Sequence, residues 1–169
     1  MPTTLPVPIE FSLPEGWRAA PPDEVGAPDV AFIALYPQPD DGFTANITLD
    51  GGFLREGTTL EQLADASVER VREAAESVAV AGRQHVGSAA APGLTQRLAL
   101  TAVVAGGRRD LVQTQVYLAL TEAAEPHRRA LIRSILTATA AQQEDVLEDF
   151  QAFLRTVRPD PGPAAGAEA

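Results

Sequence analysis

Apolar and polar residues alternate along several short stretches of the chain, a pattern typical of strands that face a core. These stretches are residues 9–13, 43–49, 94–104 and 111–120. An apolar run at 30–36, a short segment at 83–86 and a final segment at 129–139 are also predicted to be strands. Turn-forming residues separate them, as in Pro37 to Gly42 and Ala105 to Arg108. Such short connections join antiparallel neighbours, so the pattern predicts a hairpin-rich sheet.

Two other stretches repeat their apolar residues at helical spacing. The first starts at a predicted capping box, Thr58 followed by Glu61, and its apolar stripe extends from Leu60 to Val78. The second is predicted to end at Pro159, which cannot continue a helix. Its apolar residues are Val146, Phe150, Phe153, Leu154 and Val157.

Several of the predicted strands carry apolar residues on both faces, which favours a sheet covered on both sides. We therefore predict an α+β fold in which helices cover an antiparallel sheet as an α/β/α sandwich. The chain of 169 residues is long enough for one sizeable core. Residues 1–159 are predicted to form a single domain, and the Pro/Ala/Gly-rich residues 160–169 a disordered tail.

Charge and composition exclude several classes of function. The net charge is −10, so phosphate backbones and anionic membrane surfaces are unfavourable partners. All 13 basic residues are arginine, which excludes a Walker-type lysine and a Schiff-base lysine. Cysteine is absent, and the two histidines, His85 and His127, lie far apart. We therefore predict no metal and no cofactor.

The N-terminal residues have neither the basic nor the apolar segment of a signal peptide, and no apolar run is long enough to cross a membrane. We accordingly expect a cytoplasmic protein without a direct membrane anchor. Arginine in place of lysine, with abundant alanine, glycine and proline, indicates a high-GC and plausibly actinobacterial genome.

Residues able to carry catalysis are present but scattered. His85 is expected on an edge strand. It could polarise Ser88, which would make the chain a small hydrolase, but nearness in sequence is not triad geometry. The acidic pair Asp40-Asp41 fits turn chemistry, and Glu144-Asp145 fits the start of a helix. Trp17 is expected to cap one edge of the core. These residues favour a protein that is not an enzyme.

Two groups of residues are candidates for binding a partner. Phe53 and Leu54 could project from a sheet edge, or could fold under the first helix. Gln113, Gln115 and Tyr117 alternate on one strand face, which is either a plain solvent-facing surface or the polar floor of a groove. On the predicted partner strand we expect this face to continue through Thr95, Arg97 and Thr101.

The order of these features resembles the actinobacterial LpqN-like proteins, within the wider PsbP-like and DcrB-like superfamily. The resemblance rests on Phe11-Ser-Leu-Pro-Glu-Gly-Trp17, Asn46, Leu54 with Gly57-Thr-Thr-Leu60, Leu111 to Tyr117 and the closing helix. It covers residues 7–158 and implies a non-enzymatic α/β/α sandwich. Relatives of this kind include lipoproteins, photosystem assembly subunits, a Ran-binding regulator and the Eag chaperones that escort secreted effectors.

These observations together predict a non-catalytic, cytoplasmic protein-binding module. We expect an adaptor or secretion-type chaperone that holds an apolar segment of another protein, such as a secreted effector or a protein with a membrane segment. Phe53, Leu54, Gln113, Gln115 and Tyr117 are the predicted contact residues. The alternatives are a self-assembling component of an envelope or secretion complex, including a homodimer, and the small hydrolase using His85.

Overall fold

The structure is a computed structural model that describes residues 9–25, 30–40, 42–89, 91–104, 106–121 and 129–159. Asp41, His127 and the predicted tail 160–169 lie outside the described residues.

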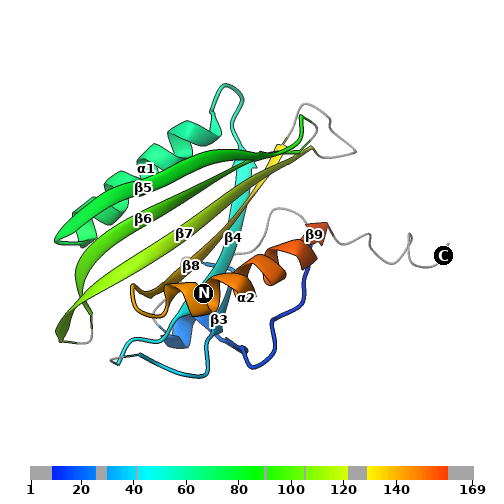
Figure 1. The fold of residues 1–169 in the computed structure, drawn as a ribbon. Coiled ribbons are helices and arrows are strands. Elements are labelled where there is room, and N and C mark those ends of the chain that lie inside the picture. Colours follow the sequence, from blue (N-terminus) through cyan, green and yellow to red (C-terminus); the bar gives the residue numbers. More distant parts are fainter. Residues whose placement is uncertain are drawn as a thin grey trace.

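A seven-stranded antiparallel sheet forms the centre of the molecule (Figure 1). Its order is β2-β3-β4-β8-β7-β6-β5, so the strands nearest in sequence are mostly neighbours in space. A separate short pair, β1 with β9, joins the two ends of the described chain. The strands are β1 (Ile9–Glu10), β2 (Arg18–Ala20), β3 (Phe32–Leu35), β4 (Asn46–Leu54), β5 (Ser77–Gly87), β6 (Pro92–Val104), β7 (Gly107–Thr121), β8 (Arg129–Thr139) and β9 (Arg158–Pro159).

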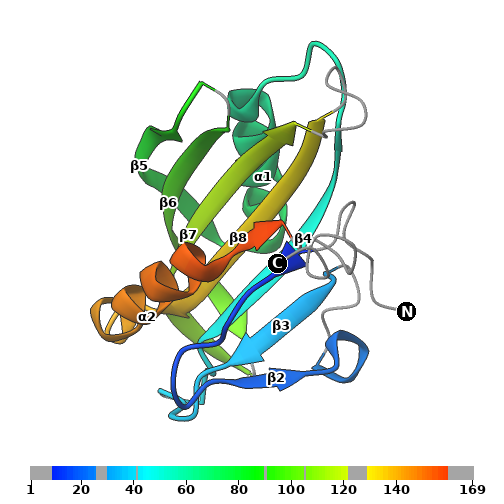
Figure 2. The same cartoon turned by 90° about the vertical axis from the view of Figure 1, so that its right-hand side faces the viewer.

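Two α-helices cover opposite faces of the sheet and different halves of it (Figures 1 and 2). Helix α1 (Leu60–Ala74) packs on β5 and β6, whereas α2 (Gln143–Thr156) packs on β8. A short 3₁₀ helix, η1 (Pro22–Val25), follows β2. The predicted α+β fold, with helices on both faces of an antiparallel sheet, is confirmed.

The larger core cluster lies between α2 and the β3-β4-β8 part of the sheet. Phe150 and Phe153 are fully buried there, and Phe11 meets Phe153 with ring centroids 5.5 Å apart. Trp17 is buried as predicted, and its Nε1 donates a hydrogen bond of 2.9 Å to the Asp149 carboxylate. The buried members are Trp17, Ala34, Ala45, Ile47, Leu49, Val116, Ile132, Leu136, Ala138, Val146, Phe150 and Phe153.

Two smaller clusters lie between α1 and the other half of the sheet. One joins Leu60 and Ala64 of α1 to Leu94, Tyr117 and Ala119. The other joins Val68 of α1 to apolar side chains of β6 and β7. Apart from Tyr117, the buried members of these clusters are aliphatic.

The predicted boundary between the first helix and the following strand is wrong. The capping box is one residue later than expected: Thr59 Oγ1 accepts from the Gln62 N–H, and Gln62 Oε1 accepts from the Thr59 N–H. The helix ends at Ala74, so Val78 lies outside it. Val78 belongs to β5, a strand of 11 residues that takes the place of the short strand predicted at 83–86. Val78 continued the apolar stripe because it also faces the α1 layer.

The two ends of the domain are less regular than predicted. Only Ile9 and Glu10 of the expected 9–13 strand pair with another strand, although Phe11 and Leu13 still pack on the core. Helix α2 ends at Thr156, where the Val157 N–H bonds to the Leu154 carbonyl, and Pro159 lies in β9. The helix thus ends before Pro159 is reached, because Arg158 and Pro159 form β9 and pair with β1.

Candidate functional site

The strand register places the three predicted residues of β7 beneath α1. Gln115 lies opposite Gln96, and Tyr117 opposite Leu94. The prediction that Thr95, Arg97 and Thr101 share this face is therefore wrong. In a strand, successive side chains point to opposite faces, so a register difference of one residue exchanges the two faces.

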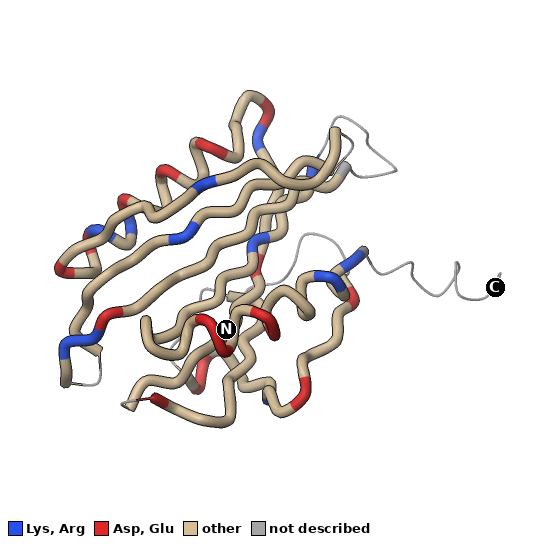
Figure 3. The backbone as a smooth tube through the Cα atoms, in the orientation of Figure 1, with Lys and Arg blue, Asp and Glu red and all other residues tan. Residues whose placement is uncertain are grey.

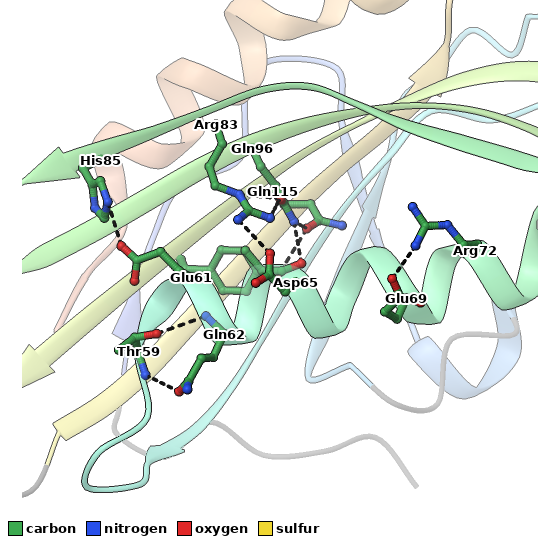
Figure 4. A network of polar contacts seen from close by, with 12 residues as sticks. Thr59, Glu61, Gln62, Asp65, Glu69, Arg72, Arg83, His85, Gln96 and Gln115 are labelled. Atoms are coloured by element: carbon green, nitrogen blue, oxygen red, sulfur yellow. Dashed lines mark hydrogen bonds and ion pairs between the residues drawn. The ribbon is translucent and has the colours of Figure 1, made fainter.

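A chain of hydrogen bonds crosses the sheet under α1 (Figure 4). The Gln96 amide Nε2 donates to the Ala64 carbonyl of α1 at 3.0 Å and to Gln115 Oε1 at 2.7 Å. Gln115 Oε1 also accepts from the Tyr117 hydroxyl at 2.9 Å. Gln115 Nε2 in turn donates to Gln113 Oε1 at 2.9 Å. Buried polar groups of this kind are costly when unpaired, so the bonds fix α1 to the sheet.

Charged groups terminate this chain at both ends. At one end Arg83 of β5 donates to Gln96 Oε1, at 2.8 Å from Nη2. At the other end Arg133 of β8 lies opposite Tyr117 and forms two hydrogen bonds with the Asp50 carboxylate, of 3.0 and 2.6 Å. Burial lowers the pKa of Arg133, but the hydrogen bonds and charges of Asp50 and Tyr117 outweigh it and raise that pKa above the ordinary value. Arg133 therefore stays cationic and holds Asp50 in place.

The predicted contact residues on β7 differ in their accessibility. Gln115 and Tyr117 are at most 1% exposed, and their polar atoms bond to neighbours within the protein. Gln113 is half-buried. A partner could contact Gln115 or Tyr117 only if α1 moved away, so their partner-binding role stays a prediction and their structural role is the one visible.

The two predicted apolar contact residues lie on opposite faces of β4. Leu54 packs against the cluster beneath α1, whereas its neighbour Phe53 is 44% exposed. This separation follows from the alternation of side chains along a strand. The structure therefore does not bring Phe53 together with the glutamine residues.

The strand β5 is the long edge of the sheet, whereas the sequence pattern indicated only a short edge strand around His85. Among the described strands only β6 pairs with it, and most of its 11 residues are exposed. Val80, 46% exposed, lies near its middle. The opposite edge is formed by β2, which has only three residues. Unpaired backbone groups along an edge can pair with another strand.

Acidic residues recur along α1 (Figure 3), and Glu61 and Asp65 extend from it towards β5 (Figure 4). Asp65 pairs with Arg83 at 2.8 Å, and Glu61 pairs with His85 at 2.7 Å. Glu69 pairs with Arg72 on α1 itself. The carboxylate side chains of Asp65 and Glu69 nevertheless remain 68% and 66% exposed, so both can meet further cations.

An open hollow of 490 Å³ lies between this side of α1 and β5. Val80 and Val68 give it an apolar part, and charged side chains surround them. Its lining is Asp65, Ala66, Val68, Glu69, Arg72, Val80 and Arg83. The arrangement offers an apolar contact with acidic and basic groups at its rim, which suits a peptide side chain.

The residues considered for catalysis do not converge. His85 is 72% exposed and faces Glu61, while the Ser88 hydroxyl accepts from the Ala91 N–H at 3.2 Å. No hydrogen bond joins His85 to Ser88 in the described part of the chain. Asp40 accepts a hydrogen bond of 2.6 Å from the Thr139 hydroxyl, and Glu144 and Asp145 occupy the first turn of α2.

The described ranges hold neither a candidate metal site nor a candidate membrane-spanning helix. No group of three or more His, Cys, Asp or Glu side chains there is placed to hold a metal ion. Neither described α-helix has the length and apolar character needed to cross a membrane.

No family profile and no curated protein matches the sequence. Solved structures do match. LpqN of Mycobacterium tuberculosis, involved in cell envelope biogenesis, is 12% identical with a TM-score of 0.63, over 91% of this chain and 86% of LpqN. Cyanobacterial PsbP of Synechocystis sp. PCC 6803 is 15% identical with a TM-score of 0.58, over 90% and 86%.

The Saccharomyces cerevisiae Ran-binding protein Mog1p is 13% identical with a TM-score of 0.55, over 89% of each chain. Identities this low show a common fold alone, so membership of the LpqN-like family stays a prediction. The chain has the PsbP-like fold that LpqN, cyanobacterial PsbP and Mog1p share.

Proposed function

We propose that the protein is a non-catalytic binding module that holds a segment of another protein at the β5 edge. One observation carries this proposal: an exposed 11-residue edge strand borders a hollow with an apolar floor and a charged rim. A polypeptide can satisfy all three parts at once, through backbone hydrogen bonds, apolar contact and charge pairing.

The named structural neighbours agree with this proposal. Mog1p is a Ran-binding protein, and LpqN is involved in cell envelope biogenesis. Neither name denotes an enzyme. The separation of His85 from Ser88 likewise gives the hydrolase alternative no support.

The finer form of the proposal is a cytoplasmic adaptor or secretion-type chaperone, with a secreted effector or a membrane-segment protein as its partner. The exposed Phe53 would then supply a second apolar contact on the other face of the sheet. The competing idea of a self-assembling component uses the same exposed edge, so one experiment should address both.

Site-specific photo-crosslinking in the native host tests the function. A photoreactive amino acid would replace Val80 on β5, and a matched control would carry it at the exposed Gln151 on α2. We expect one reproducible protein adduct from position 80 and none from position 151. An adduct with a second copy would favour self-assembly. Equal labelling from both positions, or no protein adduct, would refute the proposal.

A further inference from the structure

The unpaired backbone groups of β5 can be assigned to individual residues. Beyond the end of β5, the Ser88 N–H donates to the Ala91 carbonyl, so residue 88 faces β6. Backbone direction alternates along a strand, so the N–H and C=O groups of Arg83 and His85 face away from β6. Their side chains point to the α1 layer, where they pair with Asp65 and Glu61.

Val80, on the other side of the irregularity at Ala81, has the same backbone orientation. The Ala91 carbonyl, just before β6, faces β5. The backbone groups of every second residue after Ala91 also face β5, and Leu98, seven residues later, therefore faces away from β5. Val80 lies opposite Leu98 and therefore also directs its N–H and C=O outward. The outward residues Val80, Arg83 and His85 thus offer a ladder for one more antiparallel or parallel strand.

The usual protection of an edge strand is weak here. Proteins guard such edges with proline, lysine, bulges or charged side chains that discourage pairing. β5 contains neither proline nor lysine, and its bulge-like irregularity affects a single position. Its two basic side chains, Arg83 and His85, are held against α1 and do not cover the edge.

From this geometry we propose that β5 adds an extended segment as an eighth strand, and that this segment carries arginine or lysine on its α1-facing side. Alternate side chains of the added strand would point into the 490 Å³ hollow. There they meet Val80 and the carboxylates of Asp65 and Glu69, which stay 68% and 66% exposed although Arg83 and Arg72, which also line the hollow, pair with them. A net charge of −10 also attracts a basic segment.

A second copy of the chain is the less suitable occupant. Antiparallel β5-to-β5 pairing would relate the two molecules by a two-fold axis perpendicular to the sheet. The two α1 helices would then lie on the same face, with the flanks that carry Glu61, Asp65 and Glu69 turned towards each other. Like charges opposed in this way disfavour the pairing.

The inference rests on the proposed binding function and specifies its mode. The probe is a short fluorescent peptide of alternating arginine and threonine, and the matched peptide has glutamate for arginine. Fluorescence anisotropy at low salt would measure binding to the full chain. We expect the arginine peptide to bind, the glutamate peptide not to bind, and the affinity to fall as salt is added.

Two variants separate edge pairing from simple charge attraction. Val80→Pro removes an outward N–H that β6 does not use, and we expect it to weaken the arginine peptide about tenfold. Val80→Thr keeps the N–H and a β-branched side chain, and should bind within about twofold of the wild type. Glu69→Gln should weaken binding about two- to threefold.

Amide hydrogen exchange on the wild-type chain provides a measurement that does not depend on any variant. The amides of Val80, Arg83 and His85 should gain protection when the arginine peptide is bound, and exposed amides of α2 should not. Unchanged protection at β5, or equal binding by both peptides or by Val80→Pro, would overturn strand addition. A photo-crosslinked partner at position 80 together with such a result would leave the binding function intact and reject only its mode.

Discussion

The two halves of the sheet are stabilised in different ways. Under α2, aromatic and aliphatic side chains from several strands form one continuous apolar cluster around Phe150 and Phe153. Under α1 the apolar contacts divide into two smaller clusters. The chain of hydrogen bonds from Gln96 through Gln115 to Tyr117 lies beneath the same helix. The α2 half therefore depends mainly on apolar burial, with separate hydrogen bonds such as that from Trp17 to Asp149, whereas the α1 half also contains a connected chain of paired polar groups.

This difference corresponds to a difference in exposure. The α2 half contains β4 and β8, which have strand neighbours on both sides. The α1 half ends at β5, which has a neighbour on one side and a charged helix flank above it. Polar bonds hold α1 in a defined position over the sheet, so the hollow beside β5 keeps its shape. The contrast suggests that the α2 half supplies stability and the α1 half supplies the binding edge.

The largest effect should come from Phe150→Ala in the α2 half. Phe150 is fully buried, so its truncation removes apolar contacts and leaves a cavity, at a cost of about 3–5 kcal/mol in the free energy of unfolding. Urea denaturation would measure this cost. Leu154→Ala on the same helix is the matched control, and should cost less because Leu154 is only half-buried. Equal costs would show that the α2 cluster is not the main source of stability.

The next largest effect should come from Gln115→Leu in the α1 half. The Tyr117 hydroxyl and the Gln96 amide would both lose an acceptor, which predicts a loss of about 1–3 kcal/mol by the same denaturation experiment. Gln113→Leu removes only the outermost bond and should cost less than about 1 kcal/mol. If Gln115→Leu proved neutral, the polar chain would not be needed to hold α1.

An intermediate effect should come from Asp50→Asn at the far end of that chain. The substitution keeps the size of the side chain but removes the charge that pairs with Arg133, at a cost of about 1–2 kcal/mol. Glu69→Gln breaks the exposed pair with Arg72, and should cost no more than about 0.5 kcal/mol. Thermal denaturation of both variants in parallel tests whether burial distinguishes the two pairs, and indistinguishable results would argue against it.

The smallest effect should come from Thr59→Ala at the start of α1. It removes the side-chain cap and should cost about 1 kcal/mol or less, with faster amide exchange confined to the first turn of α1. Gln142→Ala is the comparison at the start of α2: it removes the bond from Gln142 Nε2 to the Gln38 carbonyl but no helix cap, so amide exchange in the first turn of α2 should not change. Faster exchange throughout α1 would indicate that the cap, and not the packing below it, determines the stability of that helix.

Much of the fold could be predicted because periodicity along the chain is a local property. Strand and helix geometry impose spacings of about 2 and 3.6 residues on any segment with one buried face. The residues Val146, Phe150 and Phe153 therefore identified α2, and the alternation in β6, β7 and β8 identified the antiparallel sheet. Trp17 was also correctly assigned to the core, but from its aromatic character and its place after Pro14 and Gly16 and not from periodicity.

The candidate site was harder to predict because it depends on relations between distant segments. Val78 fitted the helical stripe as well as a strand, so the start of β5 was missed. The residues Arg83, Gln84 and His85 suggested only a short strand, although they belong to a long edge. Their pairing with α1 follows from tertiary packing and leaves no signal in the spacing of the sequence.

The sequence by itself determined the types of the main elements, their approximate positions and the antiparallel character of the sheet. Only the tertiary structure decided which face of β7 lies under α1, and therefore that Gln115 and Tyr117 are buried. It also decided that the short edge strand expected around His85 is an 11-residue edge next to β6, because strand order depends on which distant segments pair. A register difference of one residue exchanges the two faces of a strand without changing its pattern, so local alternation cannot distinguish the inner face from the outer one.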